Sequence, residues 1–127
     1  MAATNVKELD VALAALENAT LQGKLAYEGA LLMKKSGLLK GPSQKLKVFK
    51  LGREKLEGAI RKDSGNIEYR FLRLMIQENV PKVVGYKKDI DGDSTLVVNA
   101  YKSLSPVLRQ AIKDYSKTSK ILKTADL

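Results

Sequence analysis

Between Phe49 and Tyr86 the chain places small, apolar and turn-forming residues at the spacing of two packed helices. Gly52, Leu56 and Ala59 follow one another at intervals of four and three residues, so they share one face of a helix. The turn sequence at 63–66, Asp-Ser-Gly-Asn, then separates this helix from the next one. The pattern indicates a scaffold of packed helices, with no sign of a catalytic centre.

Capping and breaking residues divide the rest of the chain into short helices. Asn5 and Glu8 form a capping-box pattern that predicts a first helix ending near Asn18. Gly41-Pro42, Asn66 and Ser105-Pro106 predict the starts of later helices. We expect the remaining helices over about 21–35, 42–62, 67–80, 94–103 and 106–122.

Composition agrees with an all-α fold. The chain has 127 residues, the common size of one domain, so we expect a single all-helical domain over 1–127. Hydrophobic residues make up 44% of the chain but aromatic residues only 6%, so the core is expected to be aliphatic. No alternation typical of strands competes with the helical pattern. The prediction is a compact bundle of five or six short helices.

The chain contains no cysteine and no histidine. This composition excludes disulfides, Ser-His and Cys-His hydrolase chemistry, and zinc sites built on Cys or His. We therefore expect a protein that is not an enzyme and that uses no metal or cofactor. The N-terminus, MAATNVKEL, lacks the apolar segment of a signal peptide, and no apolar run is long enough to span a membrane, so we expect a soluble chain.

Part of the central pattern resembles a tetratricopeptide-type (TPR) helical hairpin. The resemblance covers about half of one repeat and is carried by residues that match its second helix and exit turn: Gly52, Leu56, Ala59, Ile60, Asp63 and Asn66. The following helix departs from the repeat, because charged Arg70 and Arg73 and the large Leu74 fall near its usual bulky, apolar and small positions. No copy recurs at a period of 34 residues, so the resemblance implies a TPR-like hairpin within one domain.

The middle of the chain also resembles a set of small, uncharacterised bacterial all-helical proteins. The residues that carry this resemblance are Phe49, Gly52, Ala59-Ile60, Asp63, Asn66, Glu68 to Arg73, Ile76-Gln77, Asn79, Pro81 and Gly85-Tyr86. Members of that set commonly look exported, so the resemblance implies a periplasmic or secreted protein. It implies no chemical activity.

Most of the positive charge lies in one segment. Residues 34–62 hold ten Lys or Arg and two Asp or Glu, a net of +8 within a total of +9 for the chain. Such a segment attracts polyanions, and the candidate residues on the predicted helix are Lys45, Lys47, Lys50 and Arg53. Lysine outnumbers arginine by 18 to 5, and lysine gives diffuse attraction without base-specific readout. Nucleic acid is thus a possible partner but not the favoured one.

A second basic group belongs to the last predicted helix. Arg109, Lys113, Lys117 and Lys120 follow at spacings of four, four and three, which would align them on one ridge. Lys113, Lys117 and Lys120 join the candidate polyanion-binding residues. The same lysines would stabilise the end of their own helix through its dipole, which is the simpler explanation.

Arg70, Arg73 and Gln77 align on the polar edge of the helix that begins at Asn66. Two arginines on an apolar helix need partners, and Glu57, Glu68 or Glu78 could supply an internal ion-pair network. If the edge instead lines a groove, the two guanidinium groups would bind a carboxylate or acidic peptide. These three residues are the candidate partner-binding site.

The segment from Asp89 to Ala100 resembles a calcium-binding loop only in part. Asp89, Asp91 and Asp93 match its first, third and fifth ligand positions, but Ser94 and Ala100 replace the required Gly and Glu. We interpret Asp91 or Asp93 as the cap of a helix and leave weak cation binding open.

Together these observations predict a noncatalytic helical module for protein–protein interaction or scaffolding. The alternative is low-specificity binding of nucleic acid or another polyanion through the lysine-rich surface. The sequence does not identify the protein partner or the oligomeric state.

Overall fold

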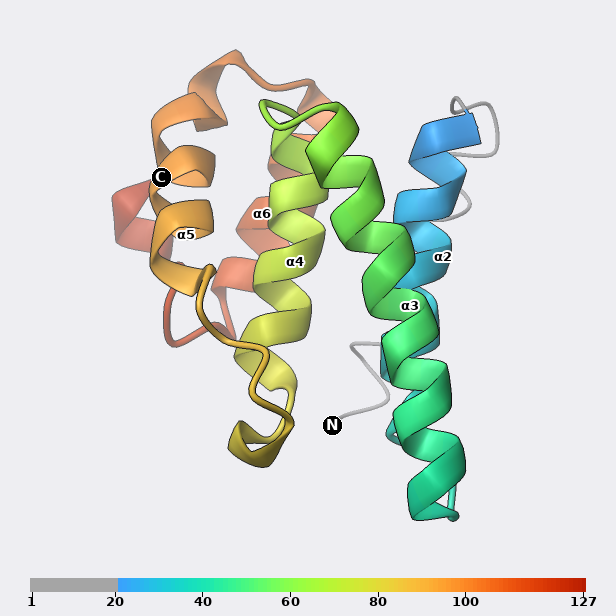
Figure 1. Cartoon of the computed structure of the whole chain (residues 1–127). Helices are drawn as coiled ribbons and strands as arrows, with labels where there is room; N and C mark the ends of the chain where they lie inside the picture. The colour runs from blue at the N-terminus through green and yellow to red at the C-terminus, as the bar shows by residue number, and fades with distance from the viewer. Residues whose placement is uncertain (1–20) are drawn as a thin grey trace. The chain divides into compact units, whose positions relative to one another are not determined.

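The structure is a computed structural model that describes residues 21–127, and every regular element in that range is helical (Figure 1). Its α-helices are α2 (Leu21–Ser36), α3 (Pro42–Lys62), α4 (Ile67–Asn79), α5 (Ile90–Ala100) and α6 (Pro106–Ser116). Short 3₁₀ helices cover Lys82–Val84, Tyr101–Ser103 and Thr124–Asp126. The predicted all-α fold is confirmed for these residues. The helix predicted from Asn5 to Asn18 lies outside the described part of the chain.

The chain forms two compact units, with the first ending at Tyr69 and the second beginning at Arg70. The expectation of one domain over 1–127 stays a prediction. None of the helices described between residues 21 and 127 is both long enough and apolar enough to cross a membrane.

In the first unit α2 and α3 form a hairpin through a short turn at residues 37–41 (Figure 1). The helices approach most closely at two glycines: a Cβ atom added to Gly29 would lie 2.5 Å from the carbonyl oxygen of Gly52. Buried apolar residues flank this crossing, namely Ala26, Tyr27, Ala30, Met33, Phe49, Leu56, Ala59 and Ile60. The sequence correctly placed Gly52 on a packed face. The assignment of the hairpin as TPR-like stays a prediction.

Local capping chemistry sets the helix starts that the sequence predicted. Gly41 is the N-cap of α3 in extended conformation, and Pro42 occupies the first turn, where a missing N–H costs nothing. Asn66 caps α4, because its Oδ1 accepts a hydrogen bond from the backbone N–H of Tyr69 at 3.1 Å. Ser105 caps α6 by accepting from the N–H of Leu108 at 3.3 Å.

Buried Tyr27 and half-buried Glu68 form a hydrogen-bonded pair within the first unit. Burial raises the pKa of the Glu68 carboxyl above its usual range, while a hydrogen bond from Tyr27 works in the opposite direction. Burial and the neighbouring Glu68 carboxylate raise the pKa of the Tyr27 phenol well above its usual range. The Tyr27 phenol therefore stays neutral at neutral pH, and the ionised form of the Glu68 carboxyl that accepts its hydrogen bond carries a desolvation cost.

The Glu68→Gln variant is expected to be more stable than the wild type at pH 7, by less than about 1 kcal/mol because Glu68 keeps solvent contact. A raised folded-state pKa means that the folded protein binds more protons than the unfolded chain. Stability therefore falls as pH rises from about 4.3, the unfolded value, through the folded-state pKa. Urea titrations between pH 4 and 8 should show this fall in wild type and not in Glu68→Gln. Glu54→Gln, at an exposed site on α3, controls for net charge, and an equal gain there would contradict the prediction.

The second unit is built around α4, where residues 71–77 are all buried. The rings of Phe71 and Tyr115 meet edge to face, with centroids 5.7 Å apart and planes at 79°. Gly85 ends the 3₁₀ turn after α4 with a φ of 74°, which favours glycine, and Tyr86 is then buried.

Two predicted boundaries in this unit are wrong. α5 begins at Ile90 and not near Ser94, with Tyr101–Ser103 continuing as a 3₁₀ turn. The Asp-Gly-Asp-Ser sequence has weak helix propensity, and tertiary contacts of Asp93 override it. α6 ends at Ser116, although Leu122 is fully buried in the segment that follows it.

Candidate functional site

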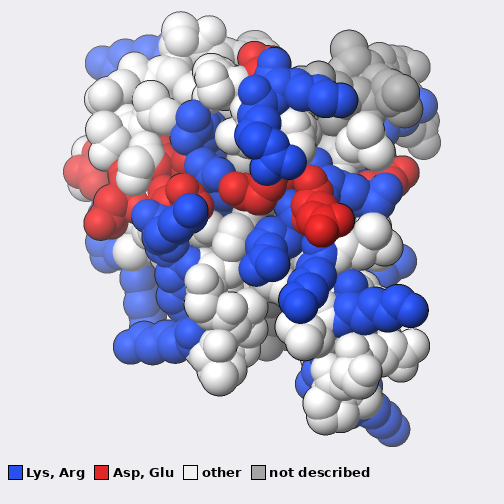
Figure 2. Space-filling view, in the orientation of Figure 1, with Lys and Arg blue, Asp and Glu red and all other residues white. Residues whose placement is uncertain are grey.

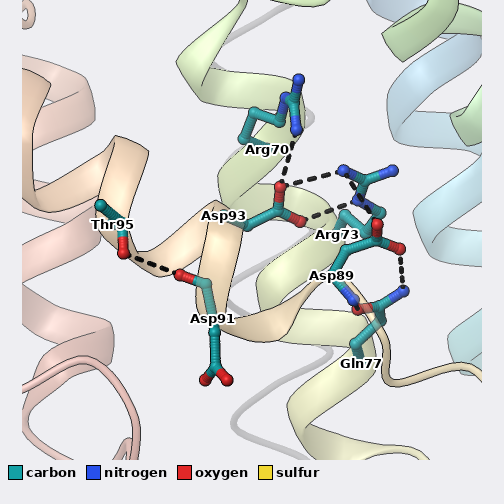
Figure 3. A network of polar contacts seen from close by, with 7 residues as sticks. All are labelled: Arg70, Arg73, Gln77, Asp89, Asp91, Asp93 and Thr95. Atoms are coloured by element: carbon teal, nitrogen blue, oxygen red, sulfur yellow. Dashed lines mark hydrogen bonds and ion pairs between the residues drawn. The ribbon is translucent and has the colours of Figure 1, made fainter.

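Asp93 is the centre of a buried ion-pair cluster between α4 and α5 (Figure 3). Arg73 binds it with two parallel hydrogen bonds, from Nε to Oδ2 at 2.8 Å and from Nη2 to Oδ1 at 3.0 Å. Arg70 adds a third, from Nη1 to Oδ1 at 3.2 Å. Asp93 is 0% exposed and Arg73 5% exposed, so this bidentate pair is removed from water.

Gln77 extends the cluster to Asp89. The Gln77 amide nitrogen donates to Asp89 Oδ2 at 2.9 Å, and the backbone N–H of Asp89 donates back to Gln77 Oε1 at 3.0 Å. Arg73 Nη2 lies 3.7 Å from Asp89 Oδ1, which makes a second ion pair. Both ends of a fully buried amide are thereby bonded. We call these five residues, Arg70, Arg73, Gln77, Asp89 and Asp93, the α4–α5 cluster.

Helical spacing explains why the α4–α5 cluster forms. Arg70, Arg73 and Gln77 are three and four residues apart on one side of α4, and Asp89 and Asp93 are four apart at the start of α5. Two arginines meet two aspartates, so the cluster is electrically balanced. Its geometry is that of a structural clamp between two helices.

The structure thus brings the three candidate partner-binding residues together. Their side-chain N–H groups, however, donate hydrogen bonds to Asp89 and Asp93 of the same chain. The internal ion-pair network that was the simpler interpretation is present. The sequence pointed to Glu57, Glu68 and Glu78 as its acids and missed both aspartates. The signal that could have found them is the complementary spacing, with basic and amide groups at 70, 73 and 77 and acids at 89 and 93.

Asp89, Asp91 and Asp93 do not form a calcium loop. Their segment is the start of α5, where Asp93 faces the two arginines, Asp89 faces Gln77 and the Asp91 side chain points away from both (Figure 3). Asp89 occupies the N-cap position without a side-chain capping bond, so the prediction that Asp91 or Asp93 caps the helix is wrong. In the described range no three His, Cys, Asp or Glu side chains are placed to share a metal ion.

The predicted basic ridge of the last helix is interrupted. Arg109 and Lys113 lie on α6, but Lys117 is its C-cap and Lys120 lies beyond its end, so an ordered ridge of four is wrong. Glu78 holds the segment after α6, accepting from the Tyr115 hydroxyl at 2.8 Å, the Ser119 hydroxyl at 2.6 Å and the N–H of Lys120 at 2.7 Å. These bonds explain why α6 does not continue beyond Ser116.

The other predicted basic surface is exposed on the hairpin of the first unit. Lys45, Lys47 and Lys50 are exposed and Arg53 is half-buried. The 25 residues from 29 to 53 contain seven Lys or Arg and no Asp or Glu. On the face shown in Figure 2, the end of the hairpin with the turn, at the lower right, shows basic and uncharged side chains without acidic ones. We call residues 34–53 the hairpin end.

Along the side of α3 that carries Lys47 and Lys50, the charge changes from basic to mixed where the hairpin end stops. Lys47, Lys50, Glu54, Glu57 and Arg61 follow at spacings of three and four, so acids interrupt the basic side chains. Lys55 pairs with Glu28 of α2 at 3.4 Å. The unbalanced positive charge is therefore concentrated in the half of α3 nearest the turn.

Comparison of the chain with protein-family models, curated proteins and solved structures finds no match.

Proposed function

We propose that this chain is a noncatalytic interaction module whose binding surface is the hairpin end. The observation that carries the proposal is the contrast between the two charged regions. The α4–α5 cluster pairs its charges internally, whereas the hairpin end exposes Lys45, Lys47 and Lys50 with no acid within its own sequence. A surface of unbalanced charge is available to a partner, and its sign requires an anionic one.

The residue types support a noncatalytic role. Without His or Cys, catalysis would depend on carboxylates or a lysine of perturbed basicity. Asp89 and Asp93, the two carboxylates of the α4–α5 cluster, are held by guanidinium and amide donors. A carboxylate with its oxygens so occupied is poorly placed to move a proton.

The lysine-rich composition also supports recognition of charge over recognition of sequence. Six of the seven basic residues between 29 and 53 are lysines, whose ammonium groups act as point charges without a fixed fork. We expect affinity to depend on the density of negative charge in the partner and to weaken with salt.

Amide NMR titration of the full chain with a glutamate-rich peptide and with a short DNA duplex tests the proposal. We expect saturable shifts confined to residues 34–53, with log affinity falling linearly with log salt for the duplex. The triple variant Lys45→Glu/Lys47→Glu/Lys50→Glu should bind at least about tenfold more weakly.

The matched control is Lys82→Glu/Lys102→Glu/Lys123→Glu, which changes net charge equally at exposed sites of the second unit. Equal loss in both triple variants would show that the overall field, and not the hairpin end, attracts anions. Absence of binding by the hairpin end to every anionic probe at low salt, whether peptide, duplex or an anionic surface, would refute the proposed function.

A further inference from the structure

Exposed leucines accompany the lysines of the hairpin end. Leu38, in the turn that follows α2, is 72% exposed, and Leu46, in the second turn of α3, is 55% exposed. Charge attraction alone gives no reason for large apolar side chains beside the turn. A partner that offers both negative charge and an apolar phase would use both kinds of residue.

The distance of Leu46 from the start of α3 matches the depth of a membrane interface, and Leu38 lies in the turn before that start. At a rise of about 1.5 Å per residue, Leu46 lies about 6 Å and Lys50 about 12 Å along the helix from Pro42. Segments that lie in an interface bury apolar groups about 5–10 Å into the boundary between headgroups and acyl chains. Leu38 and Leu46 would reach that boundary together with the backbones of Lys40 and Lys45. The long lysine side chains would extend back toward water and keep their ammonium groups among the headgroups.

A nucleic acid would use this surface less well. Single strands are bound by stacking on exposed aromatic rings, and the one aromatic residue of the hairpin end, Phe49, is only 6% exposed. Bidentate phosphate contacts favour arginine, and only Arg53 is present in this segment. Neither a phosphate backbone nor an acidic peptide chain supplies the apolar phase that exposed leucines favour.

We infer that the anionic partner of the hairpin end is a lipid bilayer surface rich in acidic headgroups, which the turn enters end-on through Leu38 and Leu46. The inference rests on the proposed function, because it names the partner of the same surface. Lysine attraction concentrates the chain at the membrane, and leucine insertion then holds it there.

Vesicle co-sedimentation with the full chain tests the inference. Vesicles of phosphatidylcholine alone are compared with vesicles containing about 30% phosphatidylserine, at low salt and at about 150 mM salt. We expect binding to the anionic vesicles only, with a part that survives the higher salt. Leu38→Gln/Leu46→Gln should lower the partition coefficient at least about tenfold at the higher salt, because inserted apolar area is lost.

Val83→Gln/Val107→Gln is the matched control, since these valines of the second unit are 93% and 68% exposed. Circular dichroism melts establish that each variant is folded. Equal vesicle binding by wild type and the leucine variant would overturn insertion. Failure to bind anionic vesicles, with duplex or peptide shifts in residues 34–53 retained, would overturn the lipid inference and leave the proposed function standing. Failure with all three probes would overturn both.

Discussion

Asp93→Ala is expected to lower the free energy of unfolding of the second unit by about 3–5 kcal/mol. The aspartate is fully buried and accepts three hydrogen bonds from Arg70 and Arg73. Alanine removes those acceptors and leaves the Arg73 guanidinium, itself 5% exposed, with its charge inadequately compensated. Chemical denaturation followed by circular dichroism measures the loss, and hydrogen exchange of α4 and α5 amides locates it.

Asp91→Ala is the control, because Asp91 lies on the same turn of α5 but is exposed. Its loss should remain below about 1 kcal/mol, the size of a helix-dipole contribution. In Arg73→Met/Asp93→Leu both charges are replaced by apolar groups, so most of the lost stability should return. A cost of less than about 1 kcal/mol for Asp93→Ala would mean that the α4–α5 cluster is not a clamp.

The α4–α5 cluster shows which features of this fold can be predicted from the sequence and which depend on tertiary packing. The helix starts at Pro42, Ile67 and Pro106 were predictable because capping involves residues at most a few positions apart. The pairing of Arg73 with Asp93 spans 20 residues and depends on how two helices pack. From local propensity we predicted that the helix begins only near Ser94, and the tertiary partners of Asp93 explain why the aspartate-rich residues before it are helical.

The end of α6 also depends on a residue far away in the sequence. Lysines at 113, 117 and 120 continue a helical spacing, and residues 117–127 contain no proline or glycine that would end the helix. The helix ends because Glu78, about 40 residues earlier in the chain, binds the Ser119 hydroxyl and the Lys120 N–H. For the hairpin end, the charge was visible in the sequence, but the exposure of Leu38 and Leu46 required the structure.

Alanine at either crossing glycine should destabilise the α2–α3 hairpin by about 3 kcal/mol, the upper part of the usual range for overpacking. A Cβ on Gly29 would lie 2.5 Å from the Gly52 oxygen and 2.7 Å from the Leu56 nitrogen. A Cβ on Gly52 would lie 2.6 Å from the Gly29 oxygen. These contacts are with backbone atoms, which no rotamer change relieves, so the helices must separate and the buried residues around them lose contact.

Gly58→Ala provides the matched control within α3, since the nearest atom to its added Cβ is the end of the flexible Arg61 side chain, at 3.7 Å. This substitution should stabilise the protein by about 0.5–1 kcal/mol through helix propensity. Because Gly29→Ala and Gly52→Ala disturb one contact, the double variant should cost less than the sum of the single variants. Thermal and urea unfolding of the four variants measures these differences. Additive losses, or stabilisation at all three glycines, would show that α2 and α3 do not cross as closely as their backbones indicate.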